Sequence, residues 1–99
     1  MNRKKCYISG RISGLPFGEV ERSFSSAVLQ VFKLGYTPVS PLNNGVPRWM
    51  PWIVHMVVDI ITIITCKVVA LQPNWKQSQG ARIEHRIAVW LGKEIIRVK

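Results

Sequence analysis

The chain has 99 residues, the length of a single domain, so we expect one domain over residues 1–99. Its apolar fraction of 47% excludes an intrinsically disordered protein, and its size excludes a large multi-lobed enzyme. Fourteen Lys and Arg against five Asp and Glu give a net charge of +9, which suits nucleic acid, phosphorylated small molecules or anionic membranes as partners; the alternative is a solvated basic surface that keeps the protein soluble.

The first part of the chain predicts two strands with a helix between them. Residues 6–9 form a short apolar run before a glycine, typical of a buried strand followed by a turn. Glycines then space out a loop over residues 10–18. Over residues 20–34 the apolar side chains recur every three or four positions, which predicts an amphipathic helix. Residues 36–39 read as an edge strand, because Pro38 has no N–H to donate to a neighbour.

The second part predicts two further strand and helix pairs. Residues 48–65 are rich in Ile and Val, but the run is too long for one strand and therefore favours a helix, apolar nearly all round. Residues 67–71 are continuously apolar, as in a central parallel strand. A helix over 81–91 and a strand over 95–98 complete the chain. Loops are predicted over residues 41–47 and 73–80.

This order of elements predicts an α/β fold. Strands that alternate with helices form right-handed crossovers, so the strands lie parallel and both faces of the sheet are covered. We therefore expect a three-layer α/β/α domain with a four-stranded parallel sheet, flavodoxin-like or Rossmann-like. Cys6 and Cys66 lie in apolar segments without metal-ligand spacing, and we interpret them as small buried hydrophobic residues.

The distribution of basic and apolar residues limits the kinds of partner that the sequence favours. The basic residues are scattered, which favours a generic basic surface over a dedicated DNA-binding face, although a nucleic-acid partner stays open. One segment, 53–72, is apolar enough to suggest a membrane span. It contains Asp59, and an Asp at the centre of an inserted helix costs about 3 kcal/mol. We therefore expect no membrane association and a cytoplasmic location.

Candidate chemistry lies in two loops that follow strands. In parallel α/β sheets, ligands bind beyond the carboxyl ends of the strands, so the loop that starts at Ser9 should meet the loop over 73–80. The first loop offers glycine amides and Arg11, and the second offers Ser78 and Gly80 at the start of a helix. Free amides and a guanidinium suit a phosphate or another anion. A purely structural turn explains the glycines equally well.

Two of the five acidic residues stand out. Asp59 lies in the middle of an apolar helix, and a buried carboxylate must be paired, protonated or directed into a polar cleft. Glu84 lies one turn into the last helix, where the helix N-terminus stabilises its charge. The structural alternatives are a backbone hydrogen bond for Asp59 and an exposed ion pair for Glu84. His55 and His85 receive no functional role.

Several sequence blocks follow one another in a specific order. The opening segment reads Tyr-Ile-Ser-Gly-Arg-Ile-Ser-Gly over residues 7–14. It is followed by Asp59, by the segment Cys-Lys-Val-Val-Ala-Leu over 66–71 and by the segment Ser-Gln-Gly-Ala-Arg-Ile-Glu over 78–84. The order and separation of these blocks are more specific than any one of them. Together they resemble the nucleoside 2-deoxyribosyltransferase superfamily over nearly the whole chain, most closely a small bacterial and phage branch without assigned function.

The resemblance implies roles for individual residues. Glu84 falls on the nucleophilic glutamate that attacks C1′ of a deoxyribose, and Asp59 on the aspartate that assists at the sugar and the departing base. Ser78 falls on the serine that contacts the phosphate in the branch acting on deoxynucleoside 5′-monophosphates. The remaining implied substrate- or phosphate-binding residues are Tyr7, Ser9, Gly10, Arg11, Ile12, Gly14 and Gly80.

The resemblance therefore implies a nucleotide-binding protein that acts as an N-glycosidase or deoxyribosyltransferase without a metal or other cofactor. A carboxylate nucleophile with an acidic partner suits this chemistry, which passes through a covalent glycosyl-enzyme. The alternative is a non-catalytic module that binds a nucleotide or nucleic acid. The apolar helix around residues 49–64 further predicts a homodimer or a higher homo-oligomer.

Overall fold

Four parallel strands form the centre of the computed structural model, which describes residues 3–99. The strands are β1 (Lys5–Ser9), β2 (Thr37–Val39), β3 (Val68–Leu71) and β4 (Glu94–Arg97). Their order in the sheet is β2-β1-β3-β4, and every neighbouring pair is parallel. The predicted parallel sheet is confirmed, as is the edge position of β2 and the internal position of β3.

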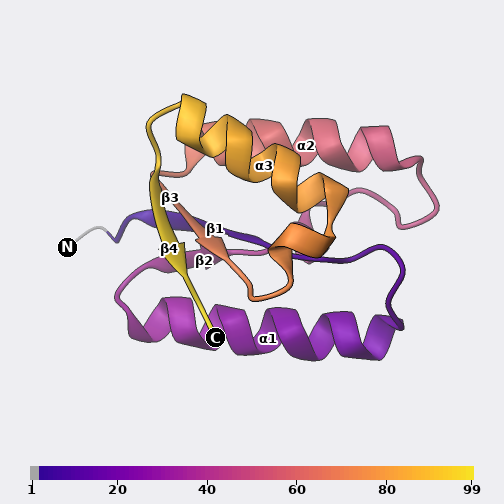
Figure 1. The fold of residues 1–99 in the computed structure, drawn as a ribbon, viewed down its shortest axis with the longest axis horizontal. Helices are drawn as coiled ribbons and strands as arrows, with labels where there is room; N and C mark the ends of the chain where they lie inside the picture. Colours follow the sequence, from indigo (N-terminus) through magenta and orange to yellow (C-terminus); the bar gives the residue numbers. More distant parts are fainter. Residues whose placement is uncertain (1–2) are drawn as a thin grey trace.

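Three helices cover the two faces of the sheet (Figure 1). Helix α1 (Phe17–Lys33) lies on one face, and α2 (Trp52–Thr65) and α3 (Gln79–Trp90) lie on the other. The helix predicted from residue 48 begins only at Trp52, because Pro47 and Pro51 interrupt the backbone pattern before it and Pro51 provides the N-cap. Short 3-10 helices, η1 (Pro41–Asn43) and η2 (Trp75–Gln77), lie in the two predicted loops.

Successive side chains of β1 point to opposite faces of the sheet, so the strand contributes to two separate hydrophobic cores and directs two hydroxyl groups at the site. Cys6 and Ile8 point toward α1 and join the core formed with Val20, Phe24 and other residues of that helix. Tyr7 belongs to the opposite core, with residues of α2 and α3. Since side chains two positions apart share a face of a strand, Ser9 points the same way as Tyr7. Both hydroxyl groups of β1 are thereby directed at α3.

Helix α2 is apolar nearly all round, as predicted, and the sequence left open whether its outer side is buried in the domain or packs against a partner subunit. Its inner residues Met56, Asp59 and Ile63 are buried against the sheet and α3. On the outer side, Ile53 and Val57 begin a row of large apolar side chains that are at least half exposed. No helix among residues 3–99 has both the length and the apolar character needed to cross a membrane.

Candidate active site

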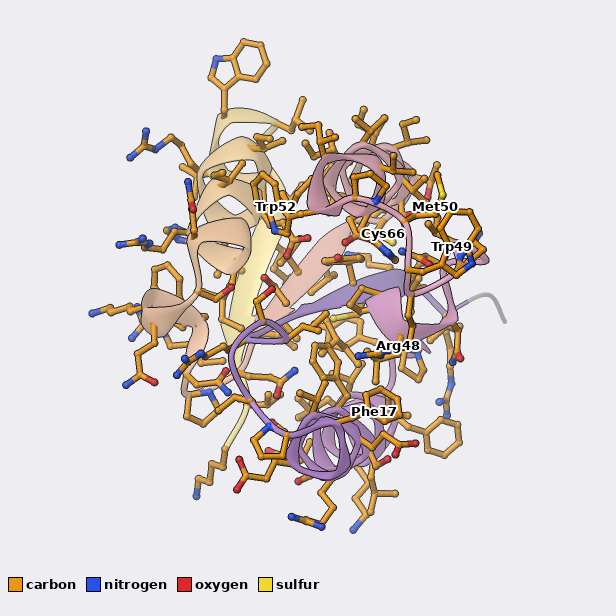
Figure 2. The ribbon with its side chains drawn as sticks, turned by 90° about the vertical axis from the view of Figure 1, so that its right-hand side faces the viewer. Phe17, Arg48, Trp49, Met50, Trp52 and Cys66 are labelled. Atoms are coloured by element: carbon orange, nitrogen blue, oxygen red, sulfur yellow. The ribbon has the colours of Figure 1, made fainter. Side chains whose placement is uncertain are left out.

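A cavity of about 400 Å³ lies at the edge of the sheet where the strands end, the edge seen in Figure 2. The loop after β1, the segment between β2 and α2, and the starts of α2 and α3 form its walls. This is the position that the parallel topology predicts for a ligand site. Its size is in the range of small-molecule sites, which begin at about 300 Å³.

Glu84 lies on the wall formed by α3 and is only 5% exposed. Each of its carboxylate oxygens accepts a hydrogen bond from β1. The Tyr7 hydroxyl donates to Oε2 at 2.8 Å, and the Ser9 hydroxyl donates to Oε1 at 2.7 Å. The residue expected as a nucleophile is therefore held in one orientation by two buried hydroxyl groups, rather than forming an exposed ion pair.

The environment of Glu84 changes its acidity. Burial raises its pKa from 4.5 to about 7, the hydrogen bonds from Ser9 and Tyr7 oppose this rise, and the charge of Asp59 adds to it. Burial and the neighbouring carboxylates likewise raise the pKa of Tyr7 well above its usual value. The Tyr7 hydroxyl therefore stays protonated and serves as a hydrogen-bond donor.

Asp59 reaches the same cavity from α2, so the two acidic residues selected from the sequence share one site. It is 5% exposed, and Asn44 donates a hydrogen bond from Nδ2 to its Oδ1 at 3.2 Å. Burial raises the pKa of Asp59, while the hydrogen bonds from Asn44 and Tyr7 act in the opposite direction. The sequence left open a structural hydrogen bond from a backbone amide to Asp59. In the structure the donor is instead the side-chain amide of Asn44 at the cavity wall.

The start of α3 provides hydrogen-bond donors on the same wall. The Ser78 hydroxyl oxygen accepts a hydrogen bond from the backbone N–H of Ala81 at 3.1 Å and caps the helix. Ser78 also lines the cavity, so its hydroxyl proton remains for a ligand. At Gly80 an added Cβ would lie 3.2 Å from the Met56 sulfur, so the missing side chain keeps this part of the cavity open.

The loop after β1 supplies backbone to the cavity rather than charge. Gly10, Ile12 and Gly14 line it, and Gly14 adopts a φ of 83°, which only glycine takes readily. Arg11 is not among the lining residues of the described chain. Its Nε donates to the Ser13 carbonyl at 3.1 Å, which turns the guanidinium back along the loop.

Three polar lining residues between β2 and the first turn of α2 were not selected from the sequence. Asn44 appeared there only as a turn residue, His55 was given no role, and Arg48 was counted with the scattered basic residues. In the structure all three face the cavity, and Asn44 Nδ2 lies 3.4 Å from His55 Nδ1. For Asn44 the chain offered one signal, the position of the predicted 41–47 loop at the carboxyl end of a strand.

The site thus combines two buried carboxylates with neutral donors and one guanidinium, that of Arg48. Residues 3–99 contain no group of three or more His, Cys, Asp and Glu side chains that is arranged to hold a metal ion. Pairs of carboxylates that line one cavity also carry out glycosidic bond cleavage in glycosidases.

Comparison with known proteins agrees with this fold. The structure is similar to a 2-desoxiribosyltransferase from Leishmania mexicana, with a TM-score of 0.66 and 20% sequence identity. The match covers 95% of this chain and 63% of that protein, so the chain spans less than two thirds of its length. This similarity concerns the fold, and it agrees with the flavodoxin-like or Rossmann-like α/β domain that the order of elements predicted.

A family assignment follows from the sequence. Residues 4–97 match the family described as a domain of unknown function, DUF4406, and the chain belongs to that family. No curated protein matches the sequence.

Proposed function

We propose that this protein cleaves the N-glycosidic bond of a deoxynucleoside 5′-monophosphate, with Glu84 as the nucleophile. A carboxylate oxygen of Glu84 forms a bond to C1′ of the sugar, and the bond from C1′ to the base breaks. Asp59 orients the sugar or protonates the departing base. Water then releases the sugar phosphate, or a second base accepts the sugar in a transfer reaction.

The two hydrogen bonds to the Glu84 carboxylate are the observation that carries this proposal. Tyr7 and Ser9 fix the carboxylate plane and favour its ionised form, which a nucleophile needs. A carboxylate kept only for stability would not need a cavity beside it. The structural similarity to a deoxyribosyltransferase supports the same class of reaction.

The phosphate is assigned to the start of α3. Ser78 offers its hydroxyl proton there, and the N-terminal field of the helix favours an anion. Gly10 and Gly14 of the loop after β1 line the same cavity. The net charge of +9 attracts a phosphorylated substrate over a neutral nucleoside. A nucleotide substrate also agrees with the expected cytoplasmic location, which stays a prediction.

Incubation with each of the four deoxynucleoside monophosphates, followed by chromatography of the released base, tests this function. We expect release by the wild-type protein and a loss of at least about 100-fold in Glu84→Ala. Glu21→Gln changes an exposed carboxylate outside the cavity and serves as the matched control. Equal release by wild type and Glu84→Ala would exclude the nucleophile, and nucleotide binding without turnover would favour a non-catalytic binding module.

We further propose that a second copy of the chain covers the outer surface of α2. Ile53, Val57, Ile61 and Ile64 follow one another at steps of four, four and three residues, and each is 50–60% exposed. Trp49, 80% exposed, precedes them. The four residues carry no charge, so the same row on a second copy is a matching surface. Ile61→Lys should convert a dimer to a monomer in light scattering; a monomeric wild-type protein would contradict the proposal.

A further inference from the structure

Arg48 holds a distinct position at the cavity. It is the one Lys or Arg side chain among the lining residues of the described chain. Its guanidinium carbon lies 3.8 Å from the centroid of the Phe17 ring, at the start of α1 (Figure 2). Stacking on an aromatic ring uses the face of the guanidinium and leaves the N–H donors along its edge for a ligand.

The sheet order places Arg48 across the cavity from the proposed phosphate site. The segment that carries Arg48 follows β2 at the edge of the sheet, whereas α3, with Ser78 and Glu84, follows β3 on the other side of β1. In Figure 2 Arg48 lies beside Phe17 and away from Trp52. Trp52 marks the side of α3, because an added Cβ at Gly80 would lie 3.7 Å from its Nε1.

The direction of attack then assigns the base to the side of Arg48. A displacement with a covalent intermediate requires the leaving group on the face of C1′ opposite the nucleophile. Glu84 approaches from α3, so the base departs toward the segment between β2 and α2. That segment also lines the cavity with apolar side chains, Leu42, Val46 and Met50, which suit the faces of a base.

We propose that Arg48 selects a 6-oxopurine, guanine or hypoxanthine, as the base of the substrate; this inference rests on the proposed function. A guanidinium only donates hydrogen bonds. Guanine and hypoxanthine present two adjacent acceptors, O6 and N7, which match two parallel N–H groups. Adenine replaces O6 with an amino donor that would face the Arg48 donors, so among the purines the guanidinium favours the 6-oxo bases.

Nucleotide affinities measured by calorimetry test base selection independently of catalysis. In the Glu84→Gln protein, which is not expected to turn over, dGMP and dIMP should bind at least about tenfold more tightly than dAMP. Adding Arg48→Gln should bring the three affinities to within about twofold by weakening dGMP and dIMP alone. Adding Arg86→Gln, which removes an equal charge from the exposed side of α3, should leave the preference intact.

Other outcomes overturn the inference in distinguishable ways. An equal loss for all three nucleotides in Arg48→Gln would place the phosphate, not the base, at Arg48, and the proposed reaction would stand. The inference about Arg48 would also fail if the Glu84→Gln protein showed no preference for dGMP and dIMP, or if that preference survived Arg48→Gln. Neither result would contradict the proposed reaction. If none of the three nucleotides binds, both the inference and the proposed function fail.

Discussion

Replacing Glu84 with Gln should change how the stability of the protein depends on pH. In the unfolded chain a glutamate has a pKa near 4.5, and in the folded protein burial raises the pKa of Glu84 to about 7. Between these two values the folded state binds a proton that the unfolded state has lost. The free energy of unfolding therefore falls as pH rises through this range.

The size of the effect follows from the two pKa values. The folded and unfolded pKa values of Glu84 differ by about 2.5, and each pKa unit corresponds to about 1.4 kcal/mol. The free energy of unfolding therefore falls by about 3 kcal/mol between pH 4 and pH 8. Glutamine has nearly the same shape and no titrating proton, so Glu84→Gln removes this contribution. At an m-value of about 1.5 kcal/mol per M, the difference amounts to about 2 M in the urea midpoint.

Urea unfolding followed by tryptophan fluorescence at four pH values between 4 and 8 measures this difference. The raised pKa of Asp59 gives a fall of the same sign in both proteins, so the comparison of wild type with Glu84→Gln isolates Glu84. Glu21→Gln, at an exposed position, should retain the wild-type slope. Equal pH slopes in wild type and Glu84→Gln would refute the argument that Glu84 is buried with a raised pKa.

Three further predictions concern the cavity walls. Gly80→Ala should weaken nucleotide binding by about tenfold with little loss of helix content, because the added methyl group would lie 3.2 Å from the Met56 sulfur; calorimetry and circular dichroism measure the two effects. Asn44→Ala should raise the pKa of Asp59 by removing the hydrogen bond at 3.2 Å, which a carboxyl NMR titration would detect, and an unchanged pKa would exclude that contact. Asp59→Asn should lower kcat of base release at least about 100-fold and leave nucleotide binding within about threefold, and retained kcat would exclude Asp59 from the reaction.

The fold could be predicted from the sequence because local patterns determined each element. The apolar runs over residues 6–9 and 67–71 gave the two central strands, and Pro38 gave the edge strand. The main difference is the start of α2. Helical spacing of apolar residues continues upstream of Trp52, but Pro51 has no N–H and caps the helix there. A periodic pattern detects a helix and does not locate its first residue.

The candidate site was predicted unevenly for a related reason. Glu84 and Asp59 lie on helices, where the spacing of residues fixes which side chains face the sheet, and the resemblance of the motifs selected them. Asn44 reaches the cavity from the segment between β2 and α2. No periodicity orients such a segment, so only the tertiary structure shows that an asparagine there contacts a buried carboxylate.

The sequence also did not show which arginine lines the cavity, and this arginine bears on the proposed orientation of the substrate. Adjacency to the glycine loop assigned Arg11 to the anion, yet its Nε donates to the carbonyl two residues onward, a local contact that turns the guanidinium along the loop. Arg48, 34 positions beyond Gly14 in the chain, lines the cavity instead. In the proposed orientation the phosphate lies at the start of α3, which offers neutral donors and a helix N-terminus. A substrate bound in this frame directs its base at Arg48, so a change in base preference on altering Arg48 also reports the direction in which the nucleotide lies.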